Sequence, residues 1–257
     1  MMNVLIVSLV FMFGMCIGSF LNVCIYRLPS SISIINPSRS FCPECNSAIQ
    51  FYDNIPVFSY LWLKGRCRHC KAPISFRYPL VELMTGILAV AIFLMFGLAL
   101  EAVVYFVFIS SLLVITFVDI DHKIIPDIIT LPGIPMGLGA SFLLPAMTFK
   151  SSLLGLLVGG GSLVIVAWTY SLITRKEGMG GGDIKLLGMI GTFIGWKGVI
   201  FTIFVASLAG TFVGMIVMLQ KGKNLKFAIP FGPFLSIGAM SYVFFGEKVL
   251  FWYFHLI

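Results

Sequence analysis

The chain has 257 residues, of which 59% are hydrophobic and only 11% are charged. Since soluble domains carry about a quarter charged residues, this composition excludes an ordinary soluble protein and indicates a chain surrounded mostly by lipid. The formal net charge is +7, but no basic run is long or interleaved with aromatic residues, so we expect no nucleic-acid partner. The positive charge is better explained by basic loops on the cytoplasmic side of a membrane.

The first apolar segment, residues 3–25, is predicted to be a retained transmembrane helix. No basic residue precedes it, no small-residue cleavage motif follows it, and it ends beside Arg27. A secretory signal peptide has the opposite order, with charge first, then a shorter apolar core, then a cleavage site. We therefore expect the N-terminus outside and Arg27 inside.

Apolar segments long enough to cross a ~30 Å hydrocarbon core recur along the rest of the chain. They predict an all-α polytopic membrane protein with about eight transmembrane helices, although one segment, residues 186–197, is short for a crossing. The predicted spans are residues 3–25, 80–98, 102–118, 128–146, 151–173, 186–197, 199–219 and 232–246.

The basic residues support this number of spans. With eight spans, only Lys150, Lys197 and Lys248 of the 17 basic residues fall outside. The positive-inside rule requires such an asymmetry, and a six-span or nine-span arrangement breaks it. The expected inside residues are Arg27, Arg39, Lys64, Arg66, Arg68, Lys71, Arg77, Lys123, Arg175, Lys176, Lys185, Lys221, Lys223 and Lys226.

Residues 27–79 differ from the rest of the chain, because they hold six of the 12 prolines and four of the six cysteines. This composition predicts three parts. Residues 1–26 form the first transmembrane helix, residues 27–79 form a small cytoplasmic zinc domain, and residues 80–257 form a helical membrane domain.

The zinc prediction depends on two C-x-x-C knuckles, one with Cys42 and Cys45 and one with Cys67 and Cys70. Each knuckle supplies two thiolates from one turn, and zinc prefers four such ligands in a tetrahedron. A reducing cytosol disfavours disulfides, and a metal compensates for the thin core of so small a domain. Four protein ligands make the zinc structural. Redox dithiols are an alternative, as is His69 in place of one cysteine. Two further cysteines, Cys16 and Cys24, are assigned no chemistry.

Two acidic residues are predicted to meet at the membrane surface. Asp119 ends the third span, and Asp183 precedes the sixth, after a glycine-rich stretch that includes Gly180 and Gly182. Carboxylates at such positions are costly and usually functional. Two close carboxylates share a proton, so one can accept a proton from water while the other donates to a scissile carbonyl. The glycines allow a backbone to approach closely.

Other roles for these charges stay open. In one alternative, Lys123 or Lys185 forms an ion pair with Asp119 or Asp183 and neutralises its charge. Asp121 and Asp127 are expected to face lipid headgroups, and Asp127 to cap the fourth membrane helix after Pro126. The glycine-rich stretch lacks the lysine pattern of a phosphate-binding loop.

Taken together, the motifs and their order resemble the bacterial type IV prepilin leader peptidase and N-methyltransferase family over nearly the whole chain. The two cysteine knuckles are part of this resemblance. The other motifs are Gly18-Ser19-Phe20-Leu21-Asn22-Val23 with Arg27-Leu28-Pro29, Arg77-Tyr78-Pro79-Leu80-Val81-Glu82-Leu83, the stretch from Asp119 to Asp127, the Gly-x-Gly-Asp at Gly180–Asp183, and Ile229-Pro230-Phe231-Gly232-Pro233-Phe234.

The resemblance implies that Asp119 and Asp183 are the catalytic pair, with Gly180 and Gly182 in the active-site loop. Asp119 stands seven residues before Pro126, as the family pattern requires, and is therefore preferred to Asp121. The implied reaction is removal of a short basic leader from type IV prepilins or pseudopilins, at the cytoplasmic face of the bacterial inner membrane. The Gly-x-Gly-Asp motif is also similar to that of presenilin-like aspartyl proteases.

The resemblance further implies S-adenosylmethionine-dependent methylation of the new N-terminus. It points to residues 18–82, with Asn22, Arg27 and Glu82 as candidate cofactor-binding residues and Glu82 as a receiver of the amine. Glu82 has an equal alternative as a helix-start carboxylate near the headgroups. No G-x-G-x-x-G motif of a soluble cofactor fold is present. Rival functions are a transporter that uses the aspartates as ion sites, a thiol redox protein and an assembly scaffold.

Overall fold

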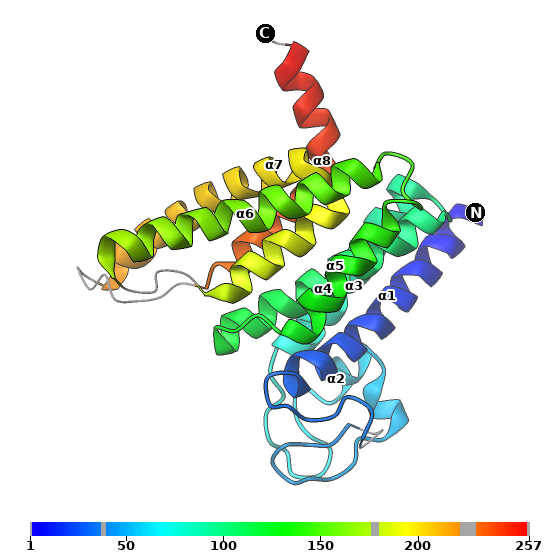
Figure 1. Cartoon of the computed structure of the whole chain (residues 1–257). Helices are drawn as coiled ribbons and strands as arrows, with labels where there is room; N and C mark the ends of the chain where they lie inside the picture. The colour runs from blue at the N-terminus through cyan, green and yellow to red at the C-terminus, as the bar shows by residue number, and fades with distance from the viewer. Residues whose placement is uncertain (1, 37–39, 176–179, 222–229, 256–257) are drawn as a thin grey trace. The chain divides into compact units, whose positions relative to one another are not determined.

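The structure is a computed structural model that describes residues 2–36, 40–175, 180–221 and 230–255 (Figure 1). All regular elements in these ranges are helices, so the all-α prediction is confirmed. Several residues named above lie outside them, namely Arg39, Lys176, Lys223, Lys226 and Ile229. The elements are α1 (Met2–Arg27), the 3₁₀ helix η1 (Phe51–Asn54), α2 (Phe58–Trp62), α3 (Arg77–Phe96), α4 (Leu100–His122), α5 (Asp127–Ala140), α6 (Phe149–Thr174), α7 (Gly181–Lys221) and α8 (Gly232–His255).

Within the described ranges, five helices are long and apolar enough to cross a membrane: α1, α3, α4, α6 and α7. The prediction of a multi-pass membrane protein is therefore confirmed. In α8 the apolar part, Gly232–Gly246, is shorter. The number of eight crossings stays a prediction.

The predicted span over residues 128–146 is wrong as a single helix. Its counterpart, α5, has 14 residues and contains Pro132 and Pro135. A helix of that length is about 21 Å long at 1.5 Å per residue, which is less than the ~30 Å hydrocarbon core. Hydropathy alone overlooked this early end, because apolar residues continue beyond Ala140.

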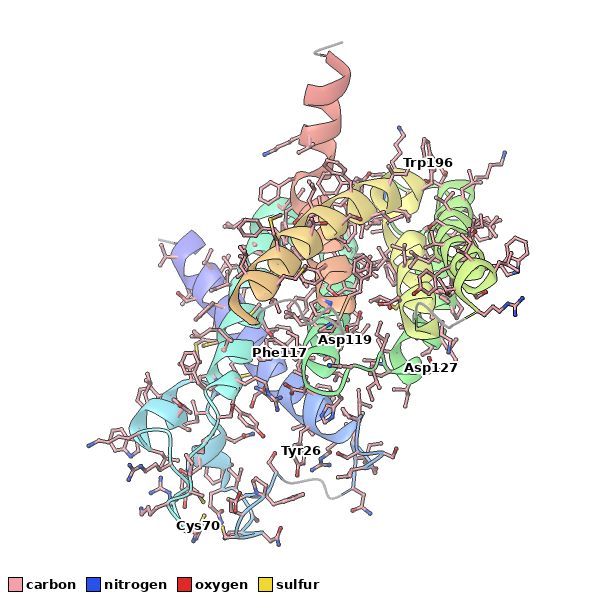
Figure 2. All side chains as sticks on the ribbon, turned by 90° about the vertical axis from the view of Figure 1, so that its left-hand side faces the viewer. Tyr26, Cys70, Phe117, Asp119, Asp127 and Trp196 are labelled. Atoms are coloured by element: carbon pink, nitrogen blue, oxygen red, sulfur yellow. The ribbon has the colours of Figure 1, made fainter. Side chains whose placement is uncertain are left out.

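Helix α7 consists of two arms, because the backbone of Gly195 leaves the helical region (φ 69°, ψ 176°). Figure 2 shows Trp196 at the bend between the arms. The arms correspond to the predicted spans over 186–197 and 199–219, with the break at Gly195 instead of Gly198. An L-residue is strained at this φ, and a Cβ here would lie 2.5 Å from Oγ of Ser151.

Two compact units make up the chain, unit 1 (Met1–Val114) and unit 2 (Ile115–Ile257), and α4 contributes to both. In unit 1, α1 packs on α3 through glycines. A Cβ on Gly18 would lie 2.7 Å from Cα of Glu82, so the backbones approach closely at the start of α3. Residues 28–36 and 40–76 of this unit form loops, η1 and α2 between the two helices.

In unit 2, α7 is the central helix and packs against α5, α6 and α8. The contact with α6 (Figure 1) is closest at Gly155 and Gly191, where a Cβ on either glycine would collide with the carbonyl oxygen of the other. Leu186 and Ile190 of α7 are completely buried, as is Leu235 of α8. This packing places the N-terminal ends of α7 and α8 in the same unit as the C-terminal end of α4.

Candidate functional site

Asp119 and Asp183, the two acids singled out above, both belong to unit 2 and are brought together there. Asp119 lies in the last turn of α4 (Figure 2) with 5% of its surface exposed. Asp183 lies in the first turn of α7 and is half-buried. The two carboxylates are close enough for their charges to interact. A proton shared between them relieves the repulsion of two ionised groups.

A residue without a predicted role completes this site. The backbone N–H of Gly232, the first residue of α8, donates a buried 2.9 Å hydrogen bond to Oδ2 of Asp119. A Cβ on Gly232 would lie 2.7 Å from the same oxygen, so only glycine leaves room for the carboxylate. The N-terminal end of a helix favours negative charge. The sequence signal was Pro233 at the second position of the helix, which indicates a helix start but not its partner.

The structure excludes one alternative role for Lys185. Its Nζ lies 2.8 Å from both carboxylate oxygens of Asp127, and both residues are exposed. The interpretation in which Lys185 neutralises one of the two site acids is therefore wrong. The prediction that Asp127 caps α5 is also wrong, because the N-cap residue is Pro126 and no side-chain hydrogen bond caps this helix. The Asp127 side chain turns to Lys185 instead.

The two glycines of the predicted active-site loop differ in their surroundings. Gly182 contacts the segment between α4 and α5, since a Cβ on it would lie 3.0 Å from Cβ of Ile125. Gly180 is exposed, and a Cβ there would lie 4.0 Å from Oδ2 of Asp183. Gly182 thus permits the start of α7 to approach the segment that follows Asp119.

In unit 1 the four knuckle cysteines form one cluster. The sulfur atoms of Cys42, Cys45, Cys67 and Cys70 all lie within 4.8 Å of one another. The Sγ atoms of Cys42 and Cys70 are 3.8 Å apart. Sulfur atoms around a tetrahedral zinc ion are also about 3.8 Å apart when the Zn–S bonds are ~2.3 Å. The cluster therefore fits the predicted metal, with His69 outside the ligand set.

The two knuckles have the same backbone. Cys42 N–H donates to Ser47 O, and Cys67 N–H donates to Ala72 O. The residue after each second cysteine, Asn46 or Lys71, adopts a positive φ. The Ser47 hydroxyl lowers the pKa of Cys45 to about 6, and the N–H groups of Cys70 and His69 lower the pKa of Cys67. Both shifts favour the thiolate form that binds metal, whereas desolvation and the other three cysteines raise the pKa of Cys70 to about 12.

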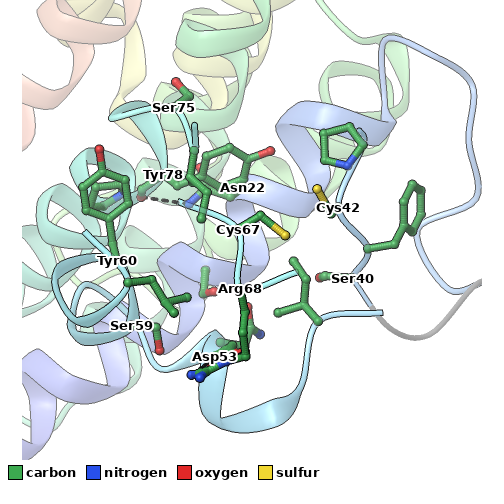
Figure 3. Close-up of a pocket in the computed structure, with 18 of the residues that line it drawn as sticks. Asn22, Ser40, Cys42, Asp53, Ser59, Tyr60, Cys67, Arg68, Ser75 and Tyr78 are labelled. Carbon is green, nitrogen blue, oxygen red and sulfur yellow. Dashed lines mark hydrogen bonds and ion pairs between the residues drawn. The ribbon is translucent and has the colours of Figure 1, made fainter. Parts of the chain in front are cut away.

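A cavity of about 390 Å³ lies in unit 1 between the end of α1, the loops and the start of α3 (Figure 3). Two of the predicted cofactor residues, Asn22 and Glu82, offer oxygen acceptors along its wall. Nδ2 of Asn22 donates to the carbonyl of Tyr78, whereas its buried Oδ1 has no hydrogen-bond partner among the residues that the structure describes. Oε2 of Glu82 accepts a 2.7 Å hydrogen bond from the N–H of Val57. Such a wall suits a ligand with N–H donors.

The third predicted cofactor residue, Arg27, has a different position. It lines the same cavity and is 4% exposed. Its Nη1 donates to the carbonyls of Ser33 and Ile34, both at 3.0 Å. These bonds tie the end of α1 to the following loop, which is a structural role.

Comparison with known proteins gives matches over most of the chain. Residues 12–96 match the Bacterial Peptidase A24 N-terminal domain, and residues 106–215 match the Type IV leader peptidase family. The chain is 38% identical over 269 residues to a prepilin leader peptidase/N-methyltransferase of Aeromonas hydrophila, covering 96% of this chain and 93% of the relative. Two relatives with the same name, from Myxococcus xanthus and Pseudomonas aeruginosa, are 40% and 35% identical over 83% and 92% of this chain and 63% and 89% of their own. No solved structure matches the chain.

Proposed function

The chain belongs to the type IV leader peptidase family, and we propose that it removes the leader of type IV prepilins or pseudopilins and then methylates the new N-terminus. Relatives that share 33–40% of its residues carry both activities in their names. The observation that carries the peptidase half is the buried Asp119, bonded to Gly232 and near Asp183. Family membership does not favour the transporter alternative.

In the proposed reaction, Asp119 is the general base. The N–H of Gly232 stabilises its ionised form, because a carboxylate accepts this bond more strongly than a carboxylic acid does. Asp119 takes a proton from a water molecule, and the oxygen of that water forms a bond to the scissile carbonyl carbon.

Asp183 is the general acid of the same step. It carries the proton that the two carboxylates share and donates it toward the carbonyl oxygen as the tetrahedral intermediate forms. When the C–N bond breaks, the leaving amine takes the proton held by Asp119, and Asp183 takes back a hydroxyl proton of the intermediate as the new carboxyl group forms. Gly180 is exposed and Asp183 is half-buried, and an extended substrate backbone would approach Asp183 along this glycine.

We place this chemistry at the cytoplasmic face of the bacterial inner membrane. The site lies at one helix end of each of α4, α7 and α8, and the distribution of basic residues assigns these ends to the inside. A basic leader stays on the same side, while the apolar helix that follows it occupies the bilayer. The scissile bond then lies at the depth of the two acids.

Zinc has a structural role in this proposal. Cys42, Cys45, Cys67 and Cys70 would hold the ion, with no open position for substrate. The ion would then join two loops that share little apolar core, and so stabilise the walls of the unit 1 cavity.

We assign the methyl-donor site to this cavity. S-adenosylmethionine, when bound, supplies an electrophilic methyl group. Oδ1 of Asn22 and the carboxylate of Glu82 would accept hydrogen bonds from amine or ammonium groups in the cavity. Glu82 would hold the new N-terminal amine and accept the proton that the amine loses, while Arg27 keeps the end of α1 in place.

Co-expression with a type IV prepilin, followed by mass spectrometry of the prepilin N-terminus, tests the proposal. We expect the leader to be absent and the new N-terminus to carry a methyl group. An Asp119→Asn variant is the control and should leave the precursor intact. A precursor that keeps its leader in the presence of the inserted wild-type chain refutes the proposal.

A further inference from the structure

Helix α2 exposes an apolar surface on the loop region of unit 1. Phe58, Leu61 and Trp62 have 62%, 67% and 72% of their surface exposed. The rings of Phe58 and Trp62 are stacked with their centroids 6.3 Å apart, so they share one face of the helical turn. Large apolar side chains gathered in this way are costly in water and mark a contact surface.

The contacts of α2 place it level with the beginning of α3. The N–H of Val57, which precedes α2, bonds to Glu82 in the second turn of α3. Glu82 lies five residues after Arg77, which corresponds to about 7.5 Å along the helix. On the other side of α2, the ring of Tyr60 packs against Phe76, the residue before α3, with centroids 6.4 Å apart.

These contacts also restrict the orientation of α2. Val57 adopts a positive φ of 61°, which is unfavourable for a β-branched residue. Ser59 is buried, and its hydroxyl donates to the carbonyl of Tyr52 while accepting from the N–H of Ile55. With the Ser59 side of α2 held by these bonds, Phe58, Leu61 and Trp62 must face away from the loops.

The charges beside this surface fit a lipid headgroup layer. Lys64 and Arg66 follow α2 directly and are exposed. Aromatic residues favour the membrane–water interface, and nearby cations attract anionic lipids. Since α3 itself is long and apolar enough to cross a membrane, its first turns lie near that interface.

From these contacts we infer that α2 is a membrane-surface anchor. Phe58, Leu61 and Trp62 insert into the headgroup region beside α3, and Lys64 and Arg66 contact anionic phospholipids. The anchor holds the loops of unit 1 against the bilayer, with the cavity wall at Glu82 attached to it. This inference depends on the membrane-spanning α3 and not on the enzymatic activity.

Fluorescence of Trp62 tests the anchor in the full-length protein. Trp168, Trp196 and Trp252 are replaced by Phe, and the protein is reconstituted into phosphatidylcholine–phosphatidylglycerol vesicles. Lipids brominated near the headgroup or near the chain end, and iodide in the water, serve as quenchers. The control is a His69→Trp variant in which all four native tryptophans are replaced by Phe. His69 is chosen because Figure 2 shows the neighbouring Cys70 at the end of the loops away from α1.

We expect shallow brominated lipid to remove most of the Trp62 emission, deep brominated lipid to remove less, and iodide to have little effect. The His69→Trp emission should show the opposite pattern. Equal iodide quenching at both positions overturns the inference. A second result also overturns the inference: neither brominated lipid nor iodide quenches Trp62, and this protection disappears when the protein is diluted in lipid. In that case a second copy of the chain covers α2. A Phe58→Trp, Trp62→Phe variant repeats the test with a second reporter, and unchanged zinc content shows that each variant is folded.

Discussion

The N–H of Gly232 and Oδ2 of Asp119, 113 residues apart in sequence, form a buried 2.9 Å hydrogen bond. Through this bond the start of α8 contacts the end of α4, beside the start of α7 that carries Asp183. The bond marks out Asp119, because it gives this carboxylate a backbone donor at the start of a helix. It explains why a glycine is needed at position 232, because a Cβ there would lie 2.7 Å from Oδ2 of Asp119.

We predict that Gly232→Ala lowers kcat for leader removal about 10²-fold, because the new Cβ would displace the Asp119 carboxylate. KM should change little, and the pH profile of kcat should shift, since the donor to the ionised acid moves. Steady-state kinetics with a purified prepilin give all three values. The matched control is Gly161→Ala on α6, where a Cβ meets nothing within 4 Å. Equal activity of the two variants contradicts the role of Gly232.

Asp119→Asn and Asp183→Asn should each reduce peptidase activity by about 10²- to 10⁴-fold, because the first removes the general base and the second the general acid. Asp121→Asn is the control, since Asp121 lies two residues from Asp119 and is exposed. Immunoblots of prepilin processing in membranes distinguish the three variants. Loss of processing in Asp121→Asn with normal processing in Asp119→Asn would reverse the assignment.

Zinc binding predicts different outcomes for two kinds of cysteine. Cys67→Ser removes one of four clustered ligands and should lose most of the bound zinc and lower the melting temperature. Cys16→Ser changes an exposed thiol on α1 and should keep one zinc per chain. Elemental analysis and thermal unfolding of the two purified proteins check this. Equal zinc in both variants would remove Cys67 from the ligand set.

Glu82→Gln should separate the two proposed activities. Methylation should fall about tenfold or more, because a charge-assisted hydrogen bond worth ~1.5–3 kcal/mol to the amine is lost. Gln keeps an oxygen that can accept from Val57 N–H, so the loops should stay in place and leader removal should continue. Mass spectrometry of the processed prepilin reports both. A parallel loss of cleavage and methylation would show that Glu82 supports the fold instead.

Close packing in unit 2 gives a stability prediction. Gly155→Ala places a methyl group against the carbonyl of Gly191 and should destabilise the protein by about 1–3 kcal/mol, as overpacking does elsewhere. Gly161→Ala on the same helix should have no such cost. Thermal unfolding in detergent compares them, and a melting temperature of Gly155→Ala equal to wild type would contradict the α6–α7 contact.

Local patterns were sufficient for much of this molecule. Hydropathy located α1, α3, α4 and α6 to within a few residues, because a membrane-spanning helix needs an apolar run of fixed minimum length. The C-x-x-C spacing predicted the cysteine cluster, because each knuckle is one local turn. Asp119 and Asp183 could be predicted because the sequence places them at helix ends and within motifs that resemble those of the family.

Other features depend on which distant segments pack together, and no local pattern contains that information. Hydropathy does not report the early end of α5 at Ala140, since apolar residues continue beyond it. The choice of Asp127 as the partner of Lys185, and of Gly232 as the donor to Asp119, follows from the packing of α5, α7 and α8 in unit 2. The exposed face of α2 likewise results from the bond between Val57 and Glu82. Local sequence patterns therefore specified the helices and the types of ligand residue. Contacts between segments tens of residues apart decided which group lies beside each of these charged side chains.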